Sequence, residues 1–232
     1  MKEIEKALEC LRHGREILLF DSDDREGETD IAIPARGITP ARVAHMRCDG
    51  GGLICVAIHP EAAKRLSLPF IADVLKKAGS NGFASLKGVA ENAGDVKYDT
   101  RSSFSLWVNH RDTFTGITDV DRSLTIHRLG EIVDSAMGSA AVDFGEHFRS
   151  PGHVAVLRAA DGLLDERRGQ TELSIALAML AGITPAMAIC EMLDGCSGYA
   201  LSKKQALEYA KKNRVVFIEG ADVIREFSIR IR

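Results

Sequence analysis

Apolar and polar positions form two kinds of block that alternate along this chain. Short apolar runs rich in strand formers and bounded by polar or glycine-rich residues are typical of buried strands. They cover 17–20, 31–33, 53–58, 103–109, 153–157, 187–190 and 215–218. Between them lie segments with helical signals, at 3–13, 118–136, 171–180 and 203–212, with a last one after 218. This alternation predicts helices packed on a central sheet.

Local signals refine this outline. Only ten residues separate the first two strands, so we expect them to pair as an antiparallel hairpin, which makes the sheet mixed. Thr39 followed by Pro40 predicts the start of a helix that runs toward Cys48, and Pro60 predicts another short helix. Residues 79–100 are polar and glycine-rich without clear periodicity, so we expect a mobile insertion or a lid there.

Composition and charge narrow the class of protein. No linker or internal repeat divides the chain, which predicts one domain over residues 1–232. The net charge is −3 and the cations are scattered, which argues against a nucleic-acid partner. No apolar run approaches the ~20 residues that span a bilayer, and the charged N-terminus is unlike a signal peptide. Five cysteines without a CxxC pair indicate reduced thiols and a cytoplasmic location.

The densest chemistry lies between the first two strands, where residues 21–30 place six carboxylates and one arginine in ten positions. Crowded carboxylates raise one another's pKa unless a cation or hydrogen bonds offset the repulsion. An oxygen-rich cluster of this kind suits a hard divalent ion such as Mg²⁺. The alternative is an acidic loop that is simply solvated.

A second dense segment, residues 167–172, combines two arginines, a glycine and a threonine just before an apolar helix. Backbone N–H groups at a helix N-terminus bind anions, and arginine adds bidentate recognition of phosphate. The alternative is ordinary helix initiation. At strand ends, His153 is either a general base or merely a polar residue, and Glu191 stands where ligands of α/β sheets gather.

Together these segments resemble the 3,4-dihydroxy-2-butanone 4-phosphate synthase family over nearly the whole chain. The resemblance rests on stretches in family order: 24–30 (DREGETD), 51–55 (GGLIC), 113–118 (TFTGIT), 149–153 (RSPGH), 157–159 (LRA), 167–172 (RRGQTE) and 190–191 (CE). The single-domain length and the variant at 28–30 resemble monofunctional archaeal members. The family implies a three-layer α/β/α sandwich around a mixed sheet, a homodimer, and dependence on Mg²⁺ or Mn²⁺.

The resemblance also implies a reaction, in which D-ribulose 5-phosphate becomes 3,4-dihydroxy-2-butanone 4-phosphate and formate during riboflavin biosynthesis. Proton abstraction gives an enediol, water is lost, the skeleton rearranges, and C4 leaves as formate. Such a sequence needs several acid and base groups around a metal. It explains why one loop would carry so many carboxylates.

The family motifs map residue by residue onto this chain. The residues implied to take part in catalysis are Glu28, Asp30, Cys55, His153 and Glu191. Those implied to contact the sugar-phosphate substrate are Arg25, Glu26, Asp30, Arg167, Arg168, Gly169, Gln170, Thr171 and Glu191. The implied metal ligands are Glu26 and Gln170. For Cys55, the alternative is a small buried core residue without a chemical role.

One position departs from the family pattern, because Gln170 stands where the family carries a metal-binding histidine. A glutamine offers an amide oxygen to a hard cation, but it has no imidazole to take up protons. The remaining acids and Arg167 favour an active metal-dependent lyase. The alternatives are a sugar-phosphate-binding homologue that lost metal chemistry through Gln170, and an isomerase that stops at the enediol.

Overall fold

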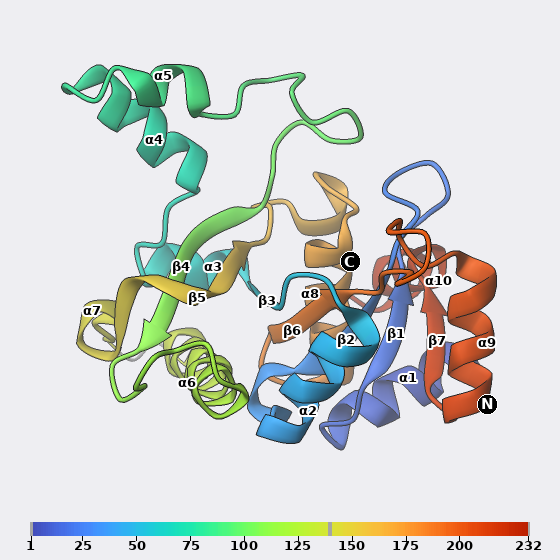
Figure 1. The fold of residues 1–232 in the computed structure, drawn as a ribbon. Coiled ribbons are helices and arrows are strands. Elements are labelled where there is room, and N and C mark those ends of the chain that lie inside the picture. The colour runs from blue at the N-terminus through green and yellow to red at the C-terminus, as the bar shows by residue number, and fades with distance from the viewer. Residues whose placement is uncertain (1, 139–140, 232) are drawn as a thin grey trace.

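The computed structural model describes residues 2–138 and 141–231, and within them seven strands form one mixed sheet with helices on both faces (Figure 1). The strands are β1 (Ile17–Phe20), β2 (Thr29–Pro34), β3 (Cys55–Ile58), β4 (Phe104–His110), β5 (Phe148–Arg158), β6 (Ala186–Glu191) and β7 (Val216–Glu219). Their order across the sheet is β4-β5-β3-β6-β2-β1-β7. The β1–β7 and β3–β5 pairs are parallel, and the other neighbours are antiparallel.

The helices fall in the gaps between strands. They are α1 (Glu3–Arg12), α2 (Pro40–His45), α3 (Pro60–Arg65), α4 (Ile71–Ser80), α5 (Ser85–Val89), α6 (Asp119–Met137), α7 (Phe144–His147), α8 (Gln170–Ala181), α9 (Lys203–Asn213) and α10 (Gly220–Arg230). Among the described residues, no helix is both long enough and apolar enough to cross a bilayer.

The two faces of the sheet carry separate hydrophobic cores, because successive side chains of a strand point to opposite sides. On β3, Val56 and Ile58 join the core that α2, α3, α6 and α9 cover. Cys55 and Ala57 join the core that α1, α8 and α10 cover. The predicted three-layer α/β/α sandwich around a mixed sheet is therefore confirmed.

Helix α8 lies in the middle of one layer and is buried along nearly its whole length. A helix that is apolar on every side needs partners all round, and here the sheet, α1 and α10 provide them. Gly182, in the left-handed conformation at φ 68°, ends the helix. This burial holds the N-terminus of α8 against the β1–β2 hairpin, where Gln170 contacts the backbone of Leu19 and Glu28.

Most predicted elements are present, with changes at their edges. The β1–β2 hairpin is antiparallel as predicted, and the Thr39 side chain caps α2. Strand β5 begins at Phe148, five positions earlier than predicted, because its first residues pair with the end of β4. The predicted irregular segment 79–100 contains the end of α4 and all of α5, a helix pair that projects from the sheet (Figure 1).

Candidate active site

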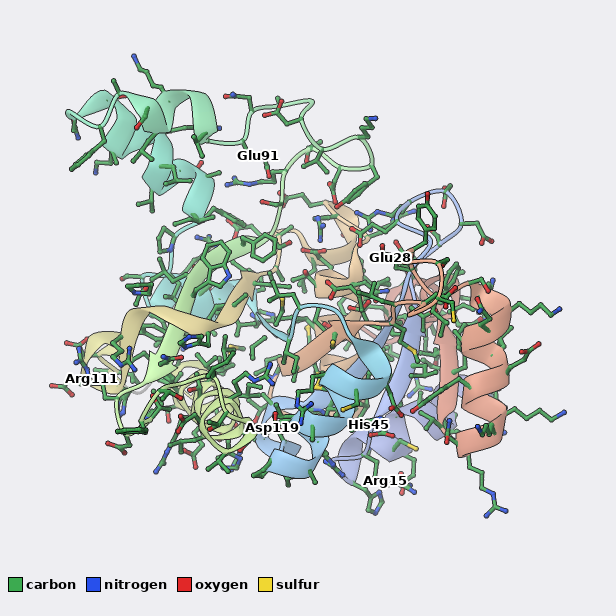
Figure 2. All side chains as sticks on the ribbon, viewed as in Figure 1. Arg15, Glu28, His45, Glu91, Arg111 and Asp119 are labelled. Carbon is green, nitrogen blue, oxygen red and sulfur yellow. The ribbon has the colours of Figure 1, made fainter. Side chains whose placement is uncertain are left out.

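A cavity of about 110 Å³ lies at the end of the sheet where β2 begins, β6 ends and α8 begins. The β1–β2 loop, the start of β3 and the segment between α5 and β4 complete its walls. Figure 2 shows Glu28 at this end of the sheet, below the segment that carries Glu91. The lining residues are Glu26, Asp30, Cys55, Val96, Tyr98, Arg101, Ser102, Ser103, Phe104, Leu157, Arg167, Gln170, Thr171, Ile189 and Glu191.

Asp30 and Glu191 form the floor of the cavity. They are direct partners across the antiparallel β2–β6 ladder, so their side chains lie on the same face. Burial raises the pKa of Asp30 well above its ordinary value, and the neighbouring carboxylates, Glu191 first, raise it further. Burial also raises the pKa of Glu191, although its Oε2 accepts a hydrogen bond of 2.9 Å from the Leu53 N–H. Such a pair retains a proton that isolated carboxyls would lose.

The β1–β2 loop is shaped by the buried Asp21, whose two carboxylate oxygens accept the N–H groups of Glu26 at 3.1 Å and Glu28 at 3.0 Å. These bonds turn the loop back over the cavity. Burial raises the pKa of Glu26 to about 7, with Arg25 acting in the opposite direction. Burial also raises the pKa of Glu28, and Glu191 and Asp21 add to the shift. The loop therefore presents two carboxyls whose pKa values are raised above the ordinary value.

Gln170 is held by its amide nitrogen, which donates to the carbonyl of Leu19 at 3.1 Å and to that of Glu28 at 3.0 Å. Both acceptors are backbone carbonyls that cannot donate, so this network fixes the orientation of the amide. Its oxygen Oε1 is buried and has no hydrogen-bond partner among the described residues. A buried carbonyl without a donor is costly, and a cation or a donor from a ligand would satisfy it.

Two arginines meet above the carboxylates. Arg25 and Arg167 contact the same oxygen of Asp99, with 2.5 Å from Arg25 Nη2 and 2.5 Å from Arg167 Nε. Glu26 lies slightly further away, at 3.8 Å from Arg25 and 4.0 Å from Arg167. The side chains of both arginines are less than 15% exposed. Two guanidinium groups that converge on one oxygen make a site for a small anion.

Arg167 is held from below by Glu172, whose fully buried carboxylate accepts from Nη1 at 2.7 Å and from the Ala160 N–H at 2.9 Å. Gly169 leaves room for this arrangement, because a Cβ there would lie 2.4 Å from Nη1 of Arg167. The glycine of the 167–172 segment thus lets the guanidinium group of Arg167 lie close against the start of α8.

Cys55 lines the cavity from the first position of β3 and is 2% exposed. Burial raises the pKa of its thiol well above the ordinary value, and the nearby Glu191 and Asp30 carboxylates raise it further. A thiolate is disfavoured in such surroundings. If Cys55 acts on a substrate, it therefore does so as a neutral thiol and not as a nucleophilic thiolate.

The sequence-derived candidates fall into three groups. Those that line the cavity are Glu26, Asp30, Cys55, Arg167, Gln170, Thr171 and Glu191. Arg25, Glu28 and Gly169 contact or adjoin these residues without lining the cavity themselves. His153 and Arg168 are exposed and lie outside the lining, where His153 contacts Asn109 and Arg168 Nε donates to the Leu164 carbonyl at 3.3 Å.

Sequence reasoning missed the contributions of Tyr98, Asp99 and Arg101. Tyr98 and Arg101 line the cavity, and Asp99 bridges the two arginines. They belong to the segment predicted as a mobile insertion or a lid, and the end of that segment lies against the cavity. Charged and aromatic residues clustered near the end of a glycine-rich stretch were the available signal, but their partners lie some seventy residues away in both directions.

The side chains around the cavity include oxygen atoms that could bind a divalent ion. Among the described residues, no group of three or more His, Cys, Asp and Glu side chains is arranged to hold a metal. Mg²⁺, however, is commonly bound by one or two protein oxygens together with waters and substrate oxygens. Glu26 and Gln170 both line the cavity, and Oε1 of Gln170 has no hydrogen-bond partner among the described residues. This oxygen-only donor set fits a hard cation better than a soft one.

Fold and site together define a class of protein: an α/β enzyme with buried acid–base carboxyls beside a small-anion site. Comparison with known proteins gives the family, because the sequence model of the 3,4-dihydroxy-2-butanone 4-phosphate synthase family matches residues 5–226. The chain is 60% identical to the protein of that name from Archaeoglobus fulgidus, over 97% of this chain and 94% of that protein. It is 44% identical to the one from Methanothermobacter thermautotrophicus, over 97% and 95%.

Solved structures agree with this assignment. A 3,4-dihydroxy-2-butanone 4-phosphate synthase in complex with two magnesium ions superposes with a TM-score of 0.76 at 25% identity, over 99% of this chain and 98% of that one. The Candida albicans enzyme gives a TM-score of 0.74 at 28% identity, over 96% of each chain. The chain belongs to the 3,4-dihydroxy-2-butanone 4-phosphate synthase family, as the resemblance predicted.

Proposed function

We propose that this protein converts D-ribulose 5-phosphate to 3,4-dihydroxy-2-butanone 4-phosphate and formate with a divalent metal, as a lyase of riboflavin biosynthesis. The observation that carries the proposal is the cavity itself. It joins carboxyls of raised pKa, an unpartnered buried amide oxygen and a converging arginine pair within about 110 Å³. The names of the relatives and the family membership support the same reaction.

The acid–base steps require groups that both take and return protons. Asp30 and Glu191 lie side by side and have raised pKa values, so one can be ionised while the other keeps a proton. The ionised member would remove a proton from the sugar, and the protonated member would return one to the departing hydroxyl. Glu28 lies near enough to influence the pair electrostatically and is a further candidate for moving protons.

Glu26 and Gln170 would hold the metal, with Mg²⁺ or Mn²⁺ as the proposed ions. Bound there, the metal would polarise the sugar carbonyl and make the neighbouring hydroxyls more acidic. A relative of known structure binds two magnesium ions. Gln170 contributes a fixed oxygen because its nitrogen is already occupied by two carbonyls.

The phosphate would lie at the start of α8. Thr171 lines the cavity there, at a helix N-terminus of the kind that binds anions, and Arg25 and Arg167 would supply the charge. Sequence reasoning also gave Arg168 and His153 roles in the site. We retain His153 as a residue for turnover, whereas the exposed position of Arg168 favours a minor role.

We further propose that the protein is a single-domain homodimer of the cytoplasm. Phe114, Ile117 and Val120 are apolar and exposed, which suits a surface covered by a second copy. The five free cysteines suit a reducing compartment. Sedimentation of the purified chain would give its oligomeric state.

One observation favours a second candidate, a sugar-phosphate-binding protein without catalysis. The described residues offer no cluster of three conventional metal-binding side chains, and Gln170 brings no charge. Such a protein would keep the arginine pair and bind ribulose 5-phosphate. It would not release formate from it.

Formate release from ribulose 5-phosphate, measured with Mg²⁺ and then with EDTA, tests the proposal. Formate that depends on the metal is the expected result, and it would exclude both the binding protein and an isomerase that stops at the enediol. A folded protein that binds ribulose 5-phosphate but yields no formate would overturn the proposed lyase.

A further inference from the structure

Asp99 occupies an unusual position, since one of its oxygens contacts both arginines of the proposed phosphate site. The two distances are equal, 2.5 Å to Arg25 Nη2 and 2.5 Å to Arg167 Nε, and the side chain of Asp99 is only 9% exposed. Only the Arg25 contact is a hydrogen bond, whereas Nε of Arg167 makes none among the described residues, so a phosphate oxygen at this position would complete the pairing of both arginines. Asp99 therefore stands where the anionic end of a sugar phosphate is expected.

The other carboxylates around the arginines are anchored differently. Asp21 holds two N–H groups of the β1–β2 loop, and Glu172 is fully buried and accepts the Ala160 N–H. Asp99 has no comparable anchor in the rest of the described structure, because its second oxygen accepts the N–H of its own neighbour Thr100. Of these carboxylates, Asp99 is the one that can leave without disrupting the core.

The backbone around Asp99 also permits a displacement. Within residues 91–102 of the described structure, a single backbone–backbone hydrogen bond forms, from the Asp95 N–H to the Asn92 carbonyl. The ends of the segment are held, because the Ser102 N–H donates to Glu91 and Arg101 pairs with Asp73. A segment fixed at both ends and loosely bonded between them can move locally at low cost.

We propose that Asp99 is a specificity-determining residue whose carboxylate holds the anion position between Arg25 and Arg167 until a phosphate ester displaces it. The inference rests on the proposed function in taking a sugar phosphate as the ligand. A phosphate dianion brings more charge and more acceptor oxygens to the two guanidinium groups than Asp99 does, and it repels the carboxylate from the same place. An uncharged pentulose offers nothing that replaces Asp99.

Competition between Asp99 and the ligand predicts the direction in which phosphate affinity changes when Asp99 is replaced. If Asp99 competes with the ligand, then weakening its hold on the arginines must tighten the binding of phosphate, because a larger fraction of the protein is ready to bind. If Asp99 instead orients the arginines for the ligand, the same change must weaken binding. The direction of the effect separates the two roles.

The test is calorimetric titration of the metal-free protein with inorganic phosphate, comparing the wild type with Asp99→Asn. Asparagine has one acceptor oxygen, so it cannot serve the arginines and the Thr100 N–H as both oxygens of Asp99 do. The matched control is Asp95→Asn, an exposed carboxylate on the same segment whose replacement keeps an acceptor for the Asn92 N–H. It reports the effect of removing one negative charge without touching the arginines.

We expect Asp99→Asn to lower the dissociation constant for phosphate by about tenfold, and Asp95→Asn to change it by less than about twofold. Asp99→Asn should also make the segment more open to trypsin at the exposed Lys97 without any ligand. In the active enzyme, KM for ribulose 5-phosphate should fall while kcat changes little. The melting temperature confirms folding, and Asp99→Ser repeats the test if the asparagine variant is unstable.

An unchanged or larger dissociation constant in Asp99→Asn would overturn the proposal, as would a failure of that variant to bind phosphate at all. The result is independent of turnover. Tighter phosphate binding without formate release would leave the role of Asp99 standing while the proposed lyase fails. Formate release with unaltered phosphate affinity would do the reverse.

Discussion

The carboxylates at the start of α6 and those around the cavity have different surroundings. Asp121 accepts three backbone N–H groups, from Phe114, Thr115 and Gly116, at 2.8 to 3.3 Å. These bonds, that of Gly116 first, lower its pKa. Asp119 pairs with Arg47 at 3.0 Å, and this bond lowers its pKa as well. In Figure 2, Asp119 lies well below Glu28.

Around the cavity the pKa values of the carboxyls are raised, not lowered. Burial raises the pKa of Glu26, Glu28, Asp30 and Glu191, and repulsion from neighbouring carboxylates adds to the shifts of the first three. Asp30 keeps an oxygen, Oδ1, without a hydrogen-bond partner among the described residues. Donors saturate the carboxylates at the cap of α6, whereas those of the cavity are left short of donors. Unsatisfied carboxyls with raised pKa values are typical of catalysis, and satisfied ones of structure.

The largest effect on turnover is expected from Glu26→Gln. This change removes the proposed metal ligand from the cavity carboxylates Glu26, Glu28, Asp30 and Glu191, which we call the donor-poor cluster. Formate release should fall at least about a hundredfold. The melting temperature should not fall, because a loop carboxyl with a raised pKa contributes little to folding. The control is Asp23→Asn on the same loop, whose side chain is 85% exposed, and its activity should match the wild type. Near-native turnover in Glu26→Gln would contradict the metal assignment.

Gln170→His adds an imidazole to the same cluster and should tighten the binding of metal by about tenfold. One ring nitrogen can donate to the carbonyl of Leu19 or Glu28, which leaves the other free to face the cavity. Because imidazole is the softer ligand, the gain should be larger for Ni²⁺ than for Mg²⁺. Calorimetric titration with each ion measures this. Equal affinities in variant and wild type would mean that residue 170 does not reach the metal.

Asp30→Asn tests the raised pKa values of the donor-poor cluster through the pH dependence of the free energy of unfolding. The pKa of Asp30 is raised in the folded state above its ordinary value of 3.8. The folded protein therefore holds more protons than the unfolded chain above that pH, and its stability declines as the pH rises. Asparagine removes this dependence. Urea unfolding at about pH 5 and pH 8 should show the variant gaining on the wild type as the pH rises; a constant difference would argue against the raised pKa.

Asp121→Asn makes the same chemical change in the donor-rich cluster, which consists of Asp119 and Asp121 at the start of α6. The pH dependence of its stability should be opposite to that of Asp30→Asn, and its effect on turnover should be the smallest. The pKa of Asp121 is lowered, so its stabilising effect is present above the ordinary value of 3.8 and is lost as the pH falls through the folded pKa. The variant should be less stable than the wild type at neutral pH, and the gap should close in acid. Loss of turnover with stability unchanged would break the comparison of the two clusters.

Much of the fold could be predicted because its signals are local. The apolar run at 17–20, the ten-residue connection and the run at 31–33 define a hairpin without reference to the rest of the chain. Thr39 and Thr118 mark helix starts through their own side chains. Helices α4 and α5 were not predicted because they are short and pack chiefly on each other. The start of β5 was not predicted because it depends on pairing with β4.

The site could be predicted only as a set of residues. Family-specific stretches named Glu26, Asp30, Arg167 and Glu191, and the cavity brings all four together. No pattern in the sequence distinguishes Arg167, which faces the cavity, from Arg168, which is exposed. Both arginines precede α8, and the difference lies in their tertiary partners, since Arg167 pairs with the buried Glu172 and with Asp99.

The alternation of elements, the crowding of acids in one loop and the replacement of a family histidine by Gln170 can all be read from the sequence. Each of these depends on residue type and spacing along the chain. The tertiary structure is what pairs Asp30 with Glu191, leaves the Gln170 oxygen without a partner among the described residues, and joins Asp99 to two arginines. These contacts link residues some 70 to 160 positions apart. Their geometry follows from the order of strands in the sheet and the burial of α8, which no short stretch of sequence encodes.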